Sequence, residues 1–340
     1  MGSRDAQAKK YMKNPQIFAD FFNGYIYGGR EVIHWESLED VDSAGLAVVP
    51  TKNGKRRNIQ KFRDILKRAV IKKGENIYYV ILGIENQADI HYAMPVRTML
   101  YNAINYMDQV DMIASSNKAN GLCEGQEYLS GFRKCDTIKP VVTVTIYWGT
   151  KTWDGPTTLR QMFGKVSSEV GRLVDDCNIN LFSIIDMQEF PEYRTELSEL
   201  FEFLNKRNDG DAMAELVSKN DKFKSISRDT AEMMRDYASV KLPNKDKEGN
   251  YDMCKAVIDL TNKGRAEGIT LGRAEGITLG RAEGITLGRA EGITQGRTET
   301  SIEYISNIMS NLNLSAEEAM KILSIPKEEY AKYLKMLLEK

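Results

Sequence analysis

The stretch Arg63–Tyr101, RDILKRAVIKKGENIYYVILGIENQADIHYAMPVRTMLY, decides the fold of this chain. Its middle contains a turn-like segment, Lys72–Asn76, which is followed by the continuous apolar run Tyr78–Ile84. The turn composition predicts a hairpin, and the β-rich apolar run predicts a central strand. Pro95 then suits the first turn of an amphipathic helix. A hairpin, a central strand and a covering helix together predict an α/β fold.

Two acidic residues stand at matching ends of the two neighbouring strands in this stretch. Asp64 precedes the short apolar pair Ile65–Leu66, and Glu85 follows the run Tyr78–Ile84. Carboxylates at strand ends can bind Mg²⁺ or Mn²⁺, with waters and a substrate phosphate completing the shell. Such an ion activates a water molecule and stabilises charge on a scissile phosphate. Gln87 shares a face with Glu85 if the strand continues, so it is placed to orient the nucleophile or the phosphate.

Basic residues lie on both sides of the two acids. Arg97 falls one turn into the predicted helix, where it can meet a phosphate. The segment Lys52–Lys61, KNGKRRNIQK, carries five basic residues and allows two interpretations. It is either a solvated loop or a phosphate contact, with Lys55, Arg56 and Arg57 as the candidates. The following stretch Ile59–Val70 is predicted as a strand, although its apolar residues also fit one face of a helix.

Composition limits the classes of protein to consider. The chain has 340 residues, 42% hydrophobic and 28% charged, which is typical of a soluble globular protein. Its formal net charge is −1, so any surface that binds nucleic acid must be local. Four scattered cysteines support neither a disulfide framework nor a zinc site and fit a reducing cytoplasm. No apolar run is long enough to predict a membrane span.

An octapeptide repeat begins at Gly264. GRAEGITL occurs three times without error, and a fourth copy, GRAEGITQ, ends at Gln295. Each glycine costs roughly 1 kcal/mol of helix stability relative to alanine. The repeat is therefore either a semi-stable helical linker or a helical stalk through which copies of the chain associate. Ser315–Glu318 has the spacing of a capping box, which predicts a small helical module after the repeat.

Several ordered motifs between Asn14 and about Leu260 carry a resemblance to a known family. They are Arg63–Leu66, Tyr79–Gln87, Met94–Arg97 with Tyr101 one turn on, Tyr147–Gly149 at the end of a predicted strand, and Trp153–Pro156. With these motifs the chain resembles the Rpn family of recombination-promoting nucleases, which are transposase-like proteins of the PD-(D/E)XK nuclease superfamily. Short repeats that combine glycine with charged residues near the C-terminus are also typical of that family.

The resemblance implies a restriction-endonuclease-like mixed sheet flanked by helices and a metal-dependent DNA endonuclease activity. Asp64 is then the first metal-binding acid and Glu85 the second, with Mg²⁺, or alternatively Mn²⁺, as the ion. Gln87 stands where the superfamily pattern has a lysine. This departure recurs in the family, but a glutamine cannot supply the charge of a lysine. Asp20 is a candidate for an additional acid, against the simpler interpretation of an ordinary helix residue.

These expectations give a domain plan and two functional hypotheses. Residues 1–262 form the nuclease-like domain, 263–300 the repeat, and 301–340 a helical module, in a cytoplasmic protein without membrane contact. The first hypothesis is a DNA endonuclease linked to recombination, mobile elements or phage defence, which self-associates through its repeat and C-terminal helices. The alternative is a catalytically weak or inactive nuclease fold that binds DNA or a partner protein, and Gln87 is the residue that favours it.

Overall fold

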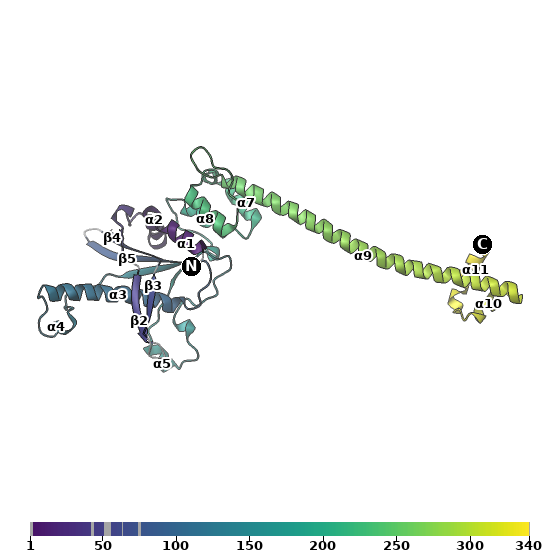
Figure 1. Cartoon of the computed structure of the whole chain (residues 1–340), viewed down its shortest axis with the longest axis horizontal. Helices are drawn as coiled ribbons and strands as arrows, with labels where there is room; N and C mark the ends of the chain where they lie inside the picture. Colours follow the sequence, from purple (N-terminus) through teal and green to yellow (C-terminus); the bar gives the residue numbers. More distant parts are fainter. Residues whose placement is uncertain (1–2, 42–43, 51–55, 63, 74–75, 340) are drawn as a thin grey trace. The chain divides into compact units, whose positions relative to one another are not determined.

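A computed structural model describes residues 3–41, 44–50, 56–62, 64–73 and 76–339 (Figure 1). The chain divides into two compact units, Met1–Asn262 and Lys263–Lys340. The first unit is mixed α/β, built on a five-stranded mixed sheet. No helix in the ranges given above combines the length and the apolar character that crossing a bilayer requires.

The central sheet has the strand order β1-β4-β5-β6-β7. Its strands are β1 (Glu39–Asp40), β4 (Ile65–Lys73), β5 (Asn76–Gln87), β6 (Val141–Tyr147) and β7 (Asn180–Ser183). The first three strands pair antiparallel, whereas β5, β6 and β7 run parallel to one another. The predicted hairpin and the predicted central strand are confirmed, because β4 and β5 are antiparallel neighbours and β5 lies in the middle of the sheet.

The predicted strand Ile59–Val70 is wrong as a single element. Its first part belongs to β3 (Arg56–Phe62), which pairs with β2 (Ala44–Pro50) in a separate two-stranded sheet. Its second part is β4, which begins at Ile65. The solvated-loop interpretation of Lys52–Lys61 is also wrong from Arg56 onward, because those residues form β3, while the remainder of that segment lies outside the described residues.

Helices cover both faces of the central sheet in the first unit. The longer ones are α1 (Ser3–Met12), α2 (Pro15–Tyr27), α3 (Met94–Ala119), α6 (Leu197–Asn205), α7 (Gly210–Lys219) and α8 (Arg228–Ala238). The shorter ones are α4 (Glu127–Ser130), α5 (Ser168–Leu173) and the 3₁₀ turns Trp35–Ser37, Arg160–Met162, Ile184–Asp186 and Asp221–Lys224.

Alternate residues of β5 pack against different helices. Val80, Leu82 and Ile84 lie in the large core with residues of α1, α2, α6 and α8. Ile81 lies on the opposite face, in a cluster that Tyr106 of α3 contacts. Because side chains alternate along a strand, the odd-numbered residues of β5, including Glu85 and Gln87, belong to the face that α3 covers.

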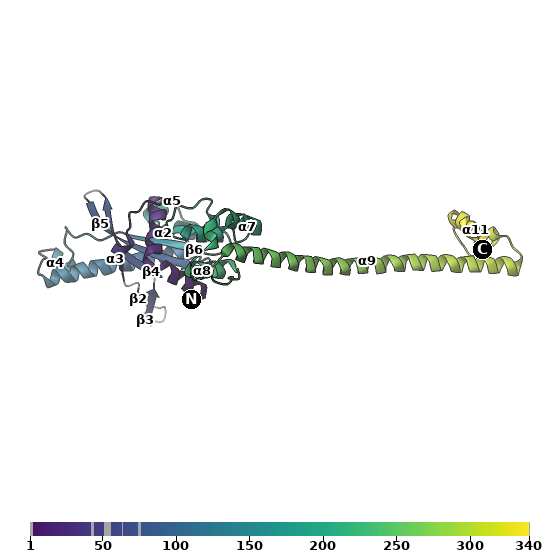
Figure 2. The same cartoon turned by 90° about the horizontal axis from the view of Figure 1, so that it is seen from above.

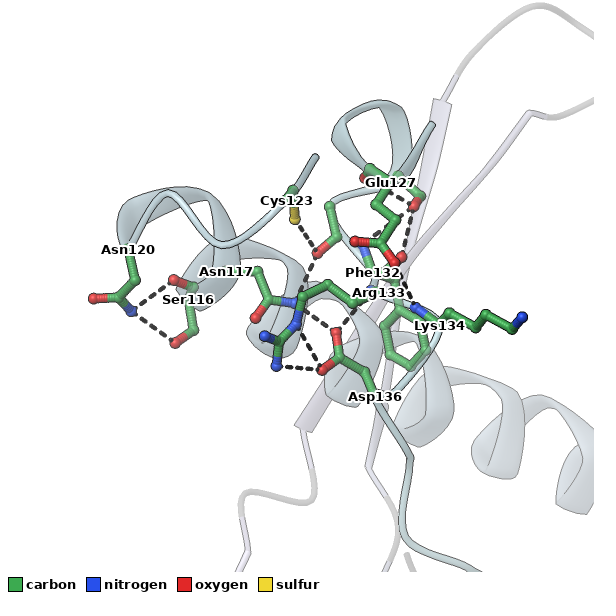
Figure 3. A network of polar contacts seen from close by, with 11 residues as sticks. Ser116, Asn117, Asn120, Cys123, Glu127, Phe132, Arg133, Lys134 and Asp136 are labelled. Carbon is green, nitrogen blue, oxygen red and sulfur yellow. Dashed lines mark hydrogen bonds and ion pairs between the residues drawn. The ribbon is translucent and has the colours of Figure 1, made fainter. Parts of the chain in front are cut away.

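A polar network fixes the segment that connects the end of α3 to the start of β6 (Figure 3). The Asn117 amide donates to the Gly131 carbonyl at 2.9 Å and to Asp136 at 2.6 Å. Asp136 also accepts hydrogen bonds from the backbone and the guanidinium of Arg133. These contacts, with Arg133 as the main cause, lower the pKa of Asp136. The crossover between the two parallel strands is therefore anchored at the far end of α3.

The second unit contains the repeat and the C-terminal module. The repeat is helical, since α9 (Met253–Leu312) contains all four copies. The turn Lys327–Glu329 lies between α10 (Ala316–Ile322) and α11 (Tyr330–Leu338), and these two helices lie beside the last turns of α9 (Figures 1 and 2). Ser315 and Glu318 form the predicted capping box. A small apolar core joins the three helices through Ile302, Ile305, Ala319, Met320 and Tyr333.

Candidate active site

The register of the β4–β5 hairpin brings Asp64 and Glu85 together. Ile65 pairs with Ile84, so one further step places Asp64 opposite Glu85. Directly opposed residues of an antiparallel pair share a face, with their Cβ atoms about 5 Å apart. Both side chains are buried, with Asp64 5% exposed and Glu85 0%. Two carboxylates thus share one site at the end of the sheet.

β5 extends past Ile84, the residue opposite the first residue of β4, so its edge toward β4 is free beyond that point. Beyond that residue, the Asn86 amide has no strand to pair with and donates instead to Asp64 Oδ2, at 2.8 Å. Two residues on, the Ala88 amide donates to Asp5 Oδ1 at 3.2 Å. Because amides two residues apart point the same way, Asp64 and Asp5 lie side by side along this edge. The edge contact also brings the N-terminal helix α1 to the site.

Glu85 has a cationic partner on α3. Arg97 Nη2 lies 3.2 Å from Glu85 Oε2, and Arg97 Nε donates to the Tyr101 hydroxyl at 3.0 Å. Pro95 stands in the first turn of α3, which fixes where the helix begins and places Arg97 one turn in. Burial alone would lower the pKa of Arg97, but the nearby charge of Glu85 raises it. The expected phosphate ligand Arg97 is therefore engaged with a carboxylate.

The ionisation of Asp64 is disfavoured by its surroundings. Burial is the largest cause and raises the pKa of this carboxyl, and the charge of Asp5 raises it further. The hydrogen bond from the Asn86 amide and the charges of Lys9 and Arg97 act in the opposite direction. A buried acid with a raised pKa is typical of functional sites, where a bound cation or a proton offsets the cost of burial.

Gln87 is the last residue of β5 and is half-buried. Its carbonyl accepts a hydrogen bond from the Trp148 amide at 2.9 Å. On the opposite face, the Asn86 side chain accepts a hydrogen bond from the Trp148 indole at 3.0 Å. These two contacts fix the end of β5, so the backbone that carries Glu85 and Gln87 is rigidly held.

Asp20 does not join the two acids. It lies on α2, which packs on the face of the sheet opposite α3. Its carboxylate accepts hydrogen bonds from the backbone amides of Arg194 and Thr195, and from the Thr195 hydroxyl at 2.6 Å. These contacts hold the segment that leads into α6. The geometry gives Asp20 a structural role.

The basic hairpin is described only in part. Lys55 lies outside the described residues, and the backbones of Arg56 and Arg57 begin β3, opposite Pro50 and Val49. The assignment of these three residues to a phosphate contact remains a prediction.

The donors at this site suit a particular class of metal ion. Within the described ranges, no group of three or more His, Cys, Asp and Glu side chains gathers as a protein-built metal cage would require. Mg²⁺ does not need such a cage, because it keeps several waters and is held by one or two carboxylates together with substrate phosphates. Asp64 and Glu85 fit that description and would hold such an ion, with Glu85 also paired to Arg97.

Comparisons of the chain with protein-family models, with curated proteins and with solved structures found no match.

Proposed function

We propose that this protein is a metal-dependent endonuclease that hydrolyses phosphodiester bonds of DNA, with Asp64 and Glu85 as the ligands of Mg²⁺ or Mn²⁺. The observation that carries the proposal is the pair of buried carboxylates at one end of two antiparallel strands, with Asp64 just before β4 and Glu85 in β5, beside the cation Arg97. Burial of two neighbouring acids is costly unless a cation compensates their charge. Arg97 pairs with Glu85, and the charges near Asp64 offset its burial only in part, so the proposal assigns the remaining compensation to a metal ion.

Each residue of the site has a role in this proposal. When bound, the ion would lower the pKa of a coordinated water and offset charge on the scissile phosphate. Arg97 holds the Glu85 side chain in one orientation through their ion pair. The Gln87 amide, which can both donate and accept hydrogen bonds, orients the water or a phosphate oxygen. Lys55, Arg56 and Arg57 contact the DNA backbone. The proposed setting is recombination, mobile-element activity or defence against phage.

Nicking of a supercoiled plasmid tests this function. The wild-type protein is expected to cut in Mg²⁺ and Mn²⁺ and not in EDTA. Glu85→Gln should lower the nicking rate on the order of 10²- to 10³-fold, because it removes the charge of a metal ligand. Glu36→Gln, at an exposed acid of the first unit, is the matched control and should cut like the wild type. A folded wild-type protein that cuts in neither metal would favour the alternative, an inactive nuclease fold that binds DNA or a partner protein.

We also propose that the repeat mediates self-association. Ile269, Ile277 and Ile285 are 51%, 69% and 51% exposed along α9, and a Cβ added at any repeat glycine would meet nothing within 4 Å. A helix so rich in glycine gains most of its stability from packing rather than from its own propensity. Each octad carries one arginine and one glutamate, so two copies can pair without accumulating like charge.

Sedimentation equilibrium on the full chain tests the self-association. We expect a dimer or a larger oligomer for the wild type, and a monomer for Ile277→Asp combined with Ile285→Asp, because buried unpaired charges would oppose packing. The control is Leu129→Asp, at a leucine that is 88% exposed outside the repeat. A monomeric wild type at micromolar concentration would contradict the proposal.

A further inference from the structure

Helix α1 is held firmly against the end of β5. Ala8, Tyr11 and Met12 are buried in the large core. At the start of the helix, the Tyr237 hydroxyl donates to the Arg4 carbonyl at 2.9 Å, while Asp5 accepts the hydrogen bond from the Ala88 amide. These contacts fix both the position of α1 and its rotation about its own axis.

The same helix face carries Lys9 toward Asp64. Lys9 follows Asp5 by four residues, so the two side chains lie on one face, about 6 Å apart along the helix. Asp5 and Asp64 accept from the amides of Ala88 and Asn86, which are about 7 Å apart along β5. One turn of α1 matches this distance. Lys13, a further turn along the helix, acts electrostatically on Asp40 of β1, which pairs with β4, so α1 runs from Ala88 toward Asp64. In agreement, the charge of Lys9 lowers the pKa of Asp64.

Lys9 differs from the other polar groups near the acids. Its side chain is half-buried and forms no ion pair within 4.0 Å in the part of the chain that the structure describes. Arg97 is engaged with Glu85. Gln87 carries no charge. Lys10, the neighbour of Lys9, is exposed and pairs with Asp229 at 3.7 Å. Lys9 is thus the cation beside Asp64 whose ammonium group is available to a ligand.

We propose that Lys9 is a further catalytic residue, whose ammonium group contacts a non-bridging oxygen of the scissile phosphate. This inference rests on the proposed nuclease function. In the hydrolysis, a water oxygen bonds to phosphorus and the bond between phosphorus and the leaving sugar oxygen breaks. One water proton goes to that sugar oxygen and one to solvent, which leaves a phosphomonoester. The Lys9 ammonium group offsets the negative charge that grows on the phosphate oxygens, a contribution that the neutral Gln87 cannot make.

Two measurements on Lys9→Gln, with Lys10→Gln as the matched control, test the proposal. In plasmid nicking with Mg²⁺, Lys9→Gln should cut about 10²- to 10³-fold more slowly than wild type, and Lys10→Gln at the wild-type rate. In EDTA, the affinity for a fluorescent DNA duplex is measured against salt concentration. Loss of one phosphate contact should reduce the slope of log K against log salt by about 0.9 for Lys9→Gln, with no reduction for Lys10→Gln.

The two measurements separate failure of this inference from failure of the nuclease proposal. A wild-type protein that cuts, beside a Lys9→Gln protein that cuts equally well, would overturn the role of Lys9 alone. An unchanged salt slope would overturn the phosphate contact even if no protein cuts DNA. Lys9→Arg guards against a folding defect, since it keeps the charge and should cut at least tenfold faster than Lys9→Gln. Equal rates for these two folded variants would also contradict the proposal.

Discussion

Asp64→Asn is expected to slow nicking strongly while leaving the protein at least as stable as the wild type at neutral pH. The asparagine carbonyl oxygen can still accept the hydrogen bond from the Asn86 amide, which is 2.8 Å long in the wild type. The substitution removes a buried negative charge whose formation the surroundings oppose. It also removes a metal ligand, which should lower the nicking rate on the order of 10³-fold.

The difference in stability between the two proteins should depend on pH with a defined sign. Burial raises the pKa of Asp64 in the folded protein above its value in the unfolded chain. The folded state then binds more protons than the unfolded state between these two pKa values. The stability that a protonated Asp64 contributes is fully present below the unfolded pKa and is lost as pH rises through the folded pKa. The advantage of Asp64→Asn should therefore be largest above the folded pKa and should shrink on acidification.

Urea unfolding across a pH series, without metal, measures this difference. Asp111→Asn serves as the control, because Asp111 is an exposed acid on α3, far along the helix from the site. It should change the free energy of unfolding by no more than about 0.5 kcal/mol at any pH. A wild-type protein that is more stable than Asp64→Asn at neutral pH would show that the carboxylate stabilises the fold, contrary to the expectation.

Arg97→Met is expected to lower the free energy of unfolding by about 3 kcal/mol in EDTA. The stability of the variant should then depend on Mg²⁺. Removal of one partner of a buried ion pair leaves the other charge uncompensated, which costs about 3–5 kcal/mol. The lower end of that range applies because the Arg97 side chain is 24% exposed, although Glu85 is fully buried. If Mg²⁺ binds Glu85, the ion replaces the lost cation, and it should stabilise the variant more than the wild type.

Urea unfolding with Mg²⁺ and with EDTA tests this result independently of any activity. Arg133→Met is the matched control, since it breaks the ion pair with Asp136 at the other end of α3, remote from Glu85. Mg²⁺ should not compensate that loss. Adding Glu85→Gln to Arg97→Met should restore much of the stability and remove the effect of Mg²⁺. Equal effects of Mg²⁺ on Arg97→Met and Arg133→Met would refute the assignment of Glu85 as a metal ligand.

Sequence predicts best the elements that carry a clear signal, such as a continuous apolar run in a buried strand or the usual residues at the ends of a helix. Tyr78–Ile84 is continuously apolar because β5 lies in the middle of the sheet with helices on both faces. In α2, Asn14 accepts a hydrogen bond from the Gln16 amide, and Gly28 ends the helix with a φ of 61°, so both ends carry their usual signals. The stretch Ile59–Val70 lacks such signals, and the structure divides it between β3 and β4, with Asp64 just before β4 accepting a hydrogen bond from the Asn86 amide.

Sequence alone predicts only the part of the candidate site that the β4–β5 hairpin brings together. The opposition of Asp64 and Glu85 follows from the hairpin register, which the turn composition indicates. The partner of Arg97 does not follow from sequence, because a phosphate and a buried carboxylate are equally suitable ligands for a guanidinium group. Asp5 and Lys9 reach the site from a distant part of the chain. Their spacing of one helical turn is an available signal, but it indicates a site only once α1 is known to lie against β5.

The carboxylates along the edge of β5 have a consequence for solubility. A strand edge with unsatisfied amides is a template on which another polypeptide can add a strand, and this is a common route to aggregation. Asp64 and Asp5 accept the hydrogen bonds of the Asn86 and Ala88 amides, so these amides are not available to an added strand. Replacing Asp64 with an apolar residue would remove a proposed metal ligand. It would also leave the Asn86 amide without its acceptor, so this edge could again accept an added strand. Selection against aggregation in a crowded cell can therefore preserve an acid here independently of the proposed chemistry.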